Sequence, residues 1–193
     1  MYKECKRLAD IILSIVGLIV LSPLFLLLPL LIKIDSKGPV LFRQKRIGKN
    51  KSIFFMFKFR TMRIETPNDV PTHLLSNANL YITRIGKILR RTSLDELPQI
   101  VNILKGDMSV IGPRPALWNQ FDLMAERDKY NANSIRPGLT GWAQIHGRDE
   151  LEIPEKAKWD GYYTQHIGFL LDVRCFFRTI LSVFIQAGVK KEL

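Results

Sequence analysis

Residues that bind transition metals or form disulfides are scarce in this chain. It contains two cysteines, Cys5 and Cys175, and three histidines, His73, His146 and His166. None of them falls into the spacing of a zinc site or a redox motif. So few cysteines exclude a disulfide-stapled scaffold and fit a reducing compartment. The sequence therefore gives no indication of a zinc centre or a disulfide framework.

Acidic residues are also few: 18 Asp and Glu stand against 29 Lys and Arg, for a net charge of +11. Ten basic residues and a single acid, Asp35, lie between Lys33 and Arg63. Because this basic block directly follows an apolar segment, it indicates contact with anionic lipid. Nucleic acid is the competing interpretation, and the neighbouring apolar segment disfavours it.

A charge-free apolar segment runs from Ile11 to Ile32. As a helix it is long enough to span the hydrocarbon core of a bilayer. A cleaved signal peptide is disfavoured because no small-residue cleavage site follows the segment. Ser22-Pro23 interrupts the segment, and Pro29 follows within two turns. Basic residues flank both ends, whereas a single span carries them mainly on one side.

Two structures remain open for this segment. One is a straight transmembrane helix. The other is a re-entrant helix–break–helix hairpin whose two ends lie on the cytoplasmic face. Its break would fall at Ser22 and Pro23, where proline removes a backbone hydrogen bond and serine can satisfy the freed carbonyl. Residues 1–36 would then form the membrane hairpin and residues 37–193 one cytosolic catalytic domain.

The remainder of the chain predicts a single α+β domain, mostly helical with short strands. Residues 64–78 are rich in turn formers and predict a surface loop. The last apolar segment is hydrophobic almost all round, which fits either a core helix or an amphipathic helix lying on a membrane. Strands are expected at 40–43, 52–60 and near 108–111, and helices at 79–89, 116–130 and 167–186.

Two adjacent carboxylates, Asp95 and Glu96, lie in the pattern Ser93-Leu94-Asp95-Glu96. This is the pattern of a capping box, in which the serine and the glutamate satisfy free amides at the start of a helix. Pro98 would be awkward inside that helix, and it fits better if the regular helix begins there. Structural capping alone would explain the acidic pair.

Positively charged side chains around the acidic pair indicate more than a cap. Arginines lie just upstream of it, and others lie in turns framed by glycine or proline, where side chains are positioned rather than mobile. Such arginines suit a diphosphate held by guanidinium forks, and a carboxylate suits Mg²⁺. A carboxylate can also be a covalent nucleophile towards phosphorus. The basic candidates for phosphate contacts are Lys58, Arg60, Arg91, Arg114, Arg136 and Arg148.

Seven ordered sequence blocks extend along the chain: Lys6-Arg7-Leu8-Ala9-Asp10, Ser22-Pro23, Gly38-Pro39-Val40-Leu41-Phe42-Arg43-Gln44-Lys45-Arg46-Ile47-Gly48, Lys58-Phe59-Arg60-Thr61-Met62, Ser93-Leu94-Asp95-Glu96-Leu97-Pro98-Gln99, Gly106-Asp107-Met108-Ser109-Val110-Ile111-Gly112-Pro113-Arg114-Pro115 and Arg136-Pro137-Gly138-Leu139-Thr140-Gly141. In these blocks the chain resembles the bacterial sugar transferases of the monotopic phosphoglycosyl transferase family. The resemblance covers essentially the whole length. We expect the minimal form of the family, without the extra N-terminal transmembrane helices of larger members.

The resemblance implies transfer of a sugar 1-phosphate from a UDP-sugar to undecaprenyl phosphate, with UMP released, at the first membrane step of glycoconjugate or exopolysaccharide biosynthesis. It implies a covalent route with Mg²⁺, in which Asp95 is the nucleophile and a magnesium ligand and Glu96 its partner. The six basic candidates would contact phosphate or nucleotide. It also favours the re-entrant hairpin, in the bacterial inner membrane, with the active site on the cytoplasmic face. A homodimer is compatible with the sequence.

Two alternatives lack this chemistry. The first is a membrane-anchored basic module that binds nucleic acid or acidic lipid, and the arginines outside the basic block argue against it. We therefore expect no nucleic-acid partner. The second is a scaffold subunit of a polysaccharide assembly complex with a degenerate site, which the intact Asp95-Glu96 pair disfavours. The sequence does not identify the sugar of the donor.

Overall fold

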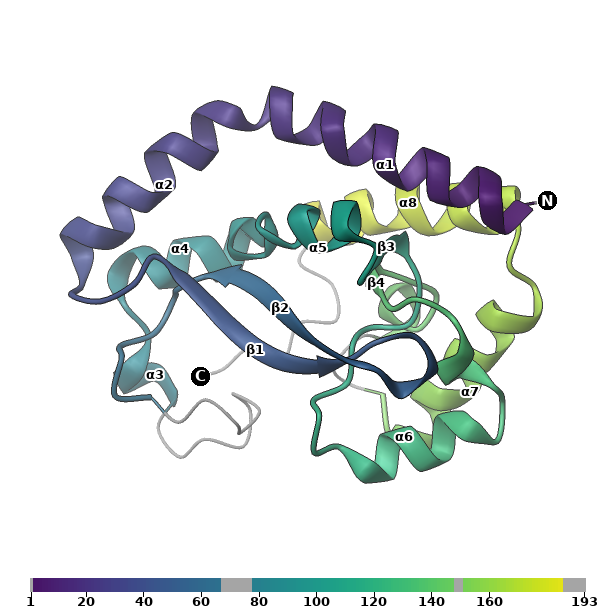
Figure 1. Cartoon of the computed structure of the whole chain (residues 1–193). Helices are drawn as coiled ribbons and strands as arrows, with labels where there is room; N and C mark the ends of the chain where they lie inside the picture. Colours follow the sequence, from purple (N-terminus) through teal and green to yellow (C-terminus); the bar gives the residue numbers. More distant parts are fainter. Residues whose placement is uncertain (1, 67–77, 148–150, 186–193) are drawn as a thin grey trace.

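The computed structural model describes residues 2–66, 78–147 and 151–185. Within these residues the protein is mostly helical with short strands, as the sequence predicts (Figure 1). Two N-terminal helices arch over one side of a domain built around an antiparallel hairpin, a short parallel strand pair and several short helices (Figure 1). The predicted loop at 64–78 falls largely outside the described residues.

The apolar segment forms two helices, α1 (Tyr2–Val20) and α2 (Ser22–Asp35), bent by 63°. The bend falls where the sequence predicts it. Ser22 Oγ donates to the carbonyl of Ile19 at 2.8 Å, and Pro23 lies in the first turn of α2, where a missing N–H costs little. Within the described residues neither helix alone has the length and hydropathy to cross a bilayer, but the bent pair together does. The segment therefore forms two helices with a bend between them and not one straight helix.

Helix α1 turns polar side chains towards the domain. Arg7 Nη2 donates to the carbonyl of Leu104 at 2.8 Å, and Asp10 Oδ1 accepts from the amide of Val110 at 3.0 Å. Asp10 is only 3% exposed. The charged block before the apolar segment thus docks α1 onto the domain. The opposite side of α1 is apolar and exposed, with Ile19 68% exposed.

The hairpin consists of β1 (Leu41–Ile47) and β2 (Ile53–Phe59), joined through the 3₁₀ turn η1 (Lys49–Lys51). Both predicted strands are present, and β1 is longer than expected. Arg43 pairs with Phe57 in the antiparallel register. Phe54 and Met56 point inward and pack with Ile103 and Met108. Since side chains alternate along a strand, Lys58 points to the same inner side.

The predicted helix at 79–89 is split into α3 (Ala78–Tyr81) and α4 (Arg84–Thr92). The chain between them pairs with an extended segment: Met62 and Ile82 form a β-bridge, and the Thr83 amide donates to the Thr61 carbonyl at 3.0 Å. Thr83 then caps α4 by accepting from the Gly86 amide. A tertiary pairing therefore overrides the helical periodicity at this point.

The C-terminal half departs more from prediction. Only α6 (Phe121–Asp128) forms within the helix expected at 116–130, because the preceding residues bridge to β1 through Leu117 and Arg46. Strands β3 (Ser109–Ile111) and β4 (Gly138–Thr140) pair in parallel. The other elements are η3 (Leu94–Glu96), α5 (Gln99–Lys105), η4 (Ala132–Ser134), η5 (Gln144–His146), α7 (Ile153–Gln165) and α8 (Phe169–Ile185). Of these, α7 was not predicted from the sequence.

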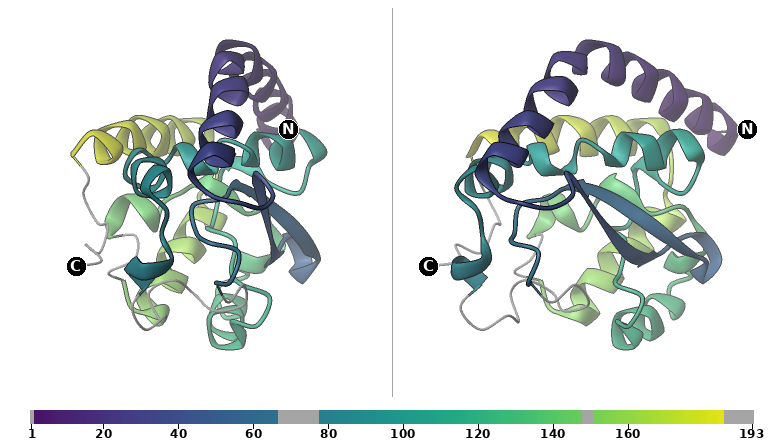
Figure 2. Two further views of the ribbon diagram at one scale, coloured as in Figure 1. Left: turned by 90° about the vertical axis from the view of Figure 1, so that its left-hand side faces the viewer. Right: turned by 60° about the vertical axis from the view of Figure 1, so that its left-hand side comes forward.

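Helices α1, α2 and α8 lie along the same side of the molecule (Figures 1 and 2). Each leaves large apolar side chains uncovered: Ile34 of α2 is 84% exposed and Leu170 of α8 is 81% exposed. An exposed apolar surface this extensive is unusual for a soluble monomer and marks a site of interaction with a membrane or another protein.

Candidate active site

The acidic pair lies in a single 3₁₀ turn, η3, between α4 and α5. The capping-box prediction is wrong. Ser93 ends α4 in the left-handed conformation (φ 57°) and makes no side-chain cap to the following turn. The regular helix α5 begins after Pro98, as that residue's position suggests. With the cap absent, the Glu96 side chain is free to turn towards the cations of the site.

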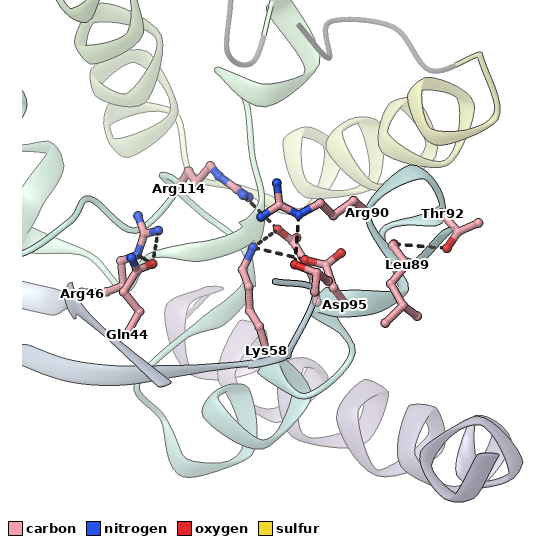
Figure 3. Close-up of polar contacts among 10 residues, drawn as sticks. Gln44, Arg46, Lys58, Leu89, Arg90, Thr92, Asp95 and Arg114 are labelled. Carbon is pink, nitrogen blue, oxygen red and sulfur yellow. Dashed lines mark hydrogen bonds and ion pairs between the residues drawn. The ribbon is translucent and has the colours of Figure 1, made fainter. Parts of the chain in front are cut away.

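Two cations from distant parts of the chain hold Glu96 (Figure 3). Lys58 Nζ of β2 lies 2.8 Å from Glu96 Oε1, and Arg114 Nη2, in the turn after β3, lies 2.9 Å from the same oxygen. The Glu96 side chain is 13% exposed. Burial by itself would raise the pKa of Glu96, but Arg114 and Lys58 together hold that pKa well below its usual range. Glu96 is therefore a fixed anion.

Asp95 is held differently, although it lies one residue away. It is 8% exposed, and its nearest ion-pair contact is Lys58 Nζ, 3.6 Å from Oδ2. Among the described residues, no group donates a hydrogen bond to its carboxylate. Burial raises the pKa of Asp95, and the adjacent Glu96 adds to this rise against the opposing attraction of Lys58 and Arg90. Asp95 thus keeps oxygen lone pairs available within a cationic setting.

Arg90 of α4 also lies close to Asp95, near Lys58 and Arg114 (Figure 3). Its Nε donates to Thr61 Oγ1 at 2.9 Å, which fixes the guanidinium next to the acidic pair. Its neighbour Arg91, which we named as a phosphate contact, is exposed on α4. The structure therefore places Arg90, rather than Arg91, at the acidic pair.

Two other predicted phosphate contacts, Arg60 and Arg136, make their hydrogen bonds away from the acidic pair. Arg60 is 6% exposed and donates through Nη2 to the carbonyl of Ser36 at 2.6 Å. Gly38 makes room for it: the glycine has φ +118°, and a Cβ there would lie 2.1 Å from Arg60 Nη1. Arg136 donates to the carbonyl of Gly106 at the end of α5. Arg148 lies outside the described residues.

A buried ion pair that the sequence did not predict lies behind Arg114. Arg127 of α6 donates through Nη2 to Asp160 Oδ2 of α7 at 2.6 Å and to the carbonyl of Arg114 at 2.9 Å. The side chains of Arg127 and Asp160 are 4% and 1% exposed. The pair fixes the backbone from which Arg114 reaches Glu96. No local motif signals it, because its members are 33 residues apart.

Asn102 of α5 is a second positioning residue that the sequence did not indicate. It is fully buried; its Oδ1 accepts from the amide of Phe57 at 3.0 Å, and its Nδ2 donates to the carbonyl of Phe55 at 2.8 Å. It thereby satisfies two backbone groups of β2 and fastens α5, which follows the acidic pair, to the strand that carries Lys58.

Replacing Asn102 by Ala is expected to destabilise the protein by about 2 kcal/mol, because two partly buried backbone groups of β2 lose their hydrogen-bond partner. We also expect roughly tenfold slower turnover, since Lys58 would shift relative to Glu96. Thermal unfolding in detergent and a turnover assay measure the two effects. Val101→Ala, at a partly exposed neighbour, is the control. Wild-type stability of Asn102→Ala would show that this side chain does not hold the site together.

The carboxylate oxygens available in the site determine whether it could bind Mg²⁺. Within the described residues no group of three or more His, Cys, Asp or Glu side chains could hold a metal ion. Glu96 is already bound to two cations, so Asp95 is the carboxylate left for a metal. Magnesium commonly uses one or two protein carboxylates and takes its other ligands from substrate phosphates and water. The site fits an ion of this kind, brought by a diphosphate.

Cations from β2, α4 and the turn after β3 gather around the acidic pair, and Lys and Arg side chains of this kind also bind phosphate. The family model for bacterial sugar transferases matches residues 1–186. The chain belongs to the bacterial sugar transferase family.

Several curated proteins are similar to the chain. It is 37% identical, over 98% of its length, to a UDP-N-acetylgalactosamine-undecaprenyl-phosphate N-acetylgalactosaminephosphotransferase of Aeromonas hydrophila, and covers 46% of that protein. It is 38% identical, over 94% of its length, to a UDP-glucose:undecaprenyl-phosphate glucose-1-phosphate transferase of Escherichia coli, and covers 40% of it. It is 36% identical to exopolysaccharide production protein ExoY of Sinorhizobium fredii, with 95% of the chain and 87% of that protein covered. The chain thus spans less than half of the two named transferases.

Proposed function

We propose that the protein transfers a sugar 1-phosphate from a UDP-sugar to undecaprenyl phosphate through a covalent intermediate on Asp95. The observation that carries the proposal is the asymmetry of the acidic pair. Glu96 is neutralised by Lys58 and Arg114, whereas Asp95 keeps its oxygen lone pairs available. The names of the related Aeromonas and Escherichia transferases, which specify a UDP-sugar and undecaprenyl phosphate, support the choice of substrates.

In the first half-reaction, a carboxylate oxygen of Asp95 attacks the β-phosphorus of the UDP-sugar. An Asp95–phosphorus bond forms, the bond from phosphorus to the bridging oxygen breaks, and UMP leaves with that oxygen. Lys58, Arg90 and Arg114 surround the acidic pair and would stabilise the charge that develops on the phosphoryl oxygens. Mg²⁺, held by Asp95 and the donor diphosphate, would neutralise further charge there.

In the second half-reaction, a phosphate oxygen of undecaprenyl phosphate attacks the same phosphorus, and the Asp95 carboxylate leaves. The products are undecaprenyl diphosphate-sugar and the regenerated enzyme, so neither water nor a redox partner is consumed. A covalent intermediate suits two substrates of such different polarity, because the soluble donor can depart as UMP before the lipid enters. Each half-reaction then needs only one arrangement of phosphate groups at the cations.

The test of this function is release of UMP by the purified chain in detergent, with undecaprenyl phosphate and a panel of UDP-sugars that includes glucose, galactose and their N-acetylated forms. We expect one or a few donors to support continuous turnover, with the lipid diphosphate-sugar formed in equal amount. If no donor in a broad panel gave UMP while the protein remained folded, the proposed reaction would be wrong.

The bent helix pair supports a membrane placement in which residues 1–36 form the re-entrant hairpin and residues 37–193 the cytoplasmic domain of a bacterial inner-membrane protein. The polar side of α1 is docked on the domain through Arg7 and Asp10, so the start of α1 and the domain lie on one side of any membrane. The exposed apolar sides of α1, α2 and α8 would then face lipid.

Cys5, which is exposed, provides a test of this placement because the other cysteine, Cys175, is buried. A membrane-impermeant maleimide is expected to label Cys5 in inside-out vesicles and not in intact spheroplasts. Asn50→Cys in the η1 turn, combined with Cys5→Ala, marks the domain and should show the same pattern. Labelling of Cys5 in intact spheroplasts would place the N-terminus outside and contradict the hairpin.

A further inference from the structure

Helix α8 carries a continuous apolar stripe that faces away from the domain. Phe169, Leu170, Phe177 and Leu181 are 67%, 81%, 60% and 58% exposed, and at 100° per residue they fall on one side of the helix. Helix α8 runs along the same side of the molecule as α1 and α2 (Figures 1 and 2). The stripe is therefore placed to lie along a membrane.

Two arginines border this stripe. Arg174 and Arg178, four residues apart on α8, are both exposed and lie at the edge of the stripe that faces η5. The guanidinium of Arg174 lies 5.6 Å from the centre of the Trp142 ring, and Arg178 Nη1 lies 3.5 Å from His146 Nε2. Within the described residues neither arginine has a carboxylate within ion-pair distance. No carboxylate of the described residues thus neutralises their charge.

The orientation of His146 adds to this arrangement. Its Nδ1 lies 2.7 Å from the carbonyl of Trp142. Because a carbonyl only accepts, Nδ1 carries the proton in that contact, and Nε2 is the nitrogen that faces Arg178. The Trp142 and His146 rings lie beside the arginines, with centroids 4.4 Å apart and ring planes tilted by 49°. The aromatic rings limit the directions in which the two guanidinium groups can point. Both groups stay exposed at the edge of the apolar stripe.

The basic block at 33–63, which the sequence suggested as the lipid contact, is arranged differently. Lys58 is bound to Glu96, Arg60 to Ser36 and Lys51 to Asp128. Arg43 and Lys45 lie on the outer face of the hairpin, over the rings of Phe57 and Trp118. Part of the block therefore serves internal contacts. Its exposed member Lys33 lies on α2 beside the exposed Ile34, so the block has one cation at an apolar helix face, whereas Arg174 and Arg178 form a pair on α8.

We propose that Arg174 and Arg178 bind the phosphate group of an anionic phospholipid, with His146 beside Arg178 as a positioning residue. A helix that lies in the membrane surface puts its apolar face among the acyl chains and its bordering cations at the level of the headgroups. Each such cation favours anionic lipid, and Arg binds phosphate in a fork geometry. This inference rests on the proposed membrane placement, and it does not depend on the transferase chemistry.

The test uses the full chain in neutral detergent micelles that contain dansyl-labelled phosphatidylglycerol or dansyl-labelled phosphatidylcholine. Energy transfer from the three tryptophans to dansyl reports bound lipid, and the arginine variants locate it, since Trp142 lies beside Arg174 and Trp118 beside Lys45. We expect phosphatidylglycerol to bind about tenfold more tightly than phosphatidylcholine, and the Arg174→Gln/Arg178→Gln protein to lose most of this preference. Arg43→Gln/Lys45→Gln, which removes two cations of the basic block, is the matched control and should keep the preference for phosphatidylglycerol.

Other outcomes would overturn the inference in separable ways. Equal binding of both lipids by the wild-type chain would disprove the headgroup preference while leaving the membrane placement intact. Binding of neither lipid would remove the membrane placement and this inference with it. If only the Arg43→Gln/Lys45→Gln protein lost the preference for phosphatidylglycerol, the basic block and not α8 would be the lipid contact. Displacement by inorganic phosphate would identify a free anion as the ligand, and displacement by undecaprenyl phosphate better than by unlabelled phosphatidylglycerol would identify the acceptor.

Discussion

Asp95→Asn is expected to lower turnover at least about 10³-fold, as removal of a covalent nucleophile does in other enzymes. The amide is nearly isosteric with the carboxylate but cannot form the phosphorus bond. Folding should not suffer: burial already raises the pKa of Asp95, so the ionised side chain costs stability that the neutral amide does not. We therefore expect an unchanged or higher Tm. Turnover is followed by UMP release, and Tm by thermal unfolding in the same detergent.

Two variants serve as controls for this result. Asp122→Asn removes an exposed carboxylate at the start of α6, whose contact is the adjacent amide of Leu123, and should leave turnover unchanged. Glu96→Gln should also slow the reaction, because Lys58 and Arg114 lose the anion that positions them. Turnover of Asp95→Asn within about tenfold of wild type, far less than removal of a nucleophile costs, would exclude Asp95 as the nucleophile.

Arg127→Met is expected to destabilise the protein by about 3–5 kcal/mol, because it leaves Asp160 as a buried charge without its partner. In a domain of this size, that loss corresponds to a Tm about 10 °C lower. Turnover should also fall, since the carbonyl of Arg114 loses the donor that fixes its position. Thermal unfolding and UMP release measure the two effects.

The stability of the Arg127→Met protein should fall as the pH rises. Burial already raises the pKa of Asp160 in the native protein, against the attraction of Arg127. Without Arg127 the pKa rises further, so the folded state binds a proton that the unfolded chain releases. Stability then falls as pH increases above the pKa of the unfolded carboxyl, and the deficit should be smaller at about pH 5 than at about pH 8.

A double replacement isolates the pair itself. In Arg127→Met/Asp160→Leu both charges are gone, and much of the lost stability should return, as it does when a buried ion pair is replaced by apolar residues of similar size. Turnover should stay low, because the Arg114 carbonyl still lacks its donor. If Arg127→Met unfolded at the wild-type temperature at both pH values, the pair would not be the support of the Arg114 turn.

Local patterns predicted much of the fold, and tertiary contacts account for what they missed. The break at Ser22-Pro23 and the two hairpin strands follow from proline chemistry and from alternation, which depend on near neighbours. The capping box failed because Glu96 finds stronger partners in two distant cations than in the Ser93 amide. The helix at 79–89 was broken by pairing with Met62, which no local pattern indicates.

The same distinction applies to the site. Asp95, Glu96, Lys58 and Arg114 could be predicted because adjacent carboxylates and arginines in rigid turns are visible in the sequence. Arg90 and Arg91 could not be told apart there, since which of them faces the acidic pair depends on how α4 packs. The supporting layer of Asn102 and the Arg127–Asp160 pair consists of ordinary residue types in ordinary helices, and only their placement gives them a role.

The most direct test of the central claim is incubation of the chain with its UDP-sugar in the absence of undecaprenyl phosphate. We expect release of one UMP per active site and an intact-protein mass increase equal to one sugar phosphate, located at Asp95 by peptide mapping. Adding undecaprenyl phosphate should then remove the added mass. No UMP release before the lipid is added, from an enzyme that turns over when both substrates are present, would contradict the covalent route.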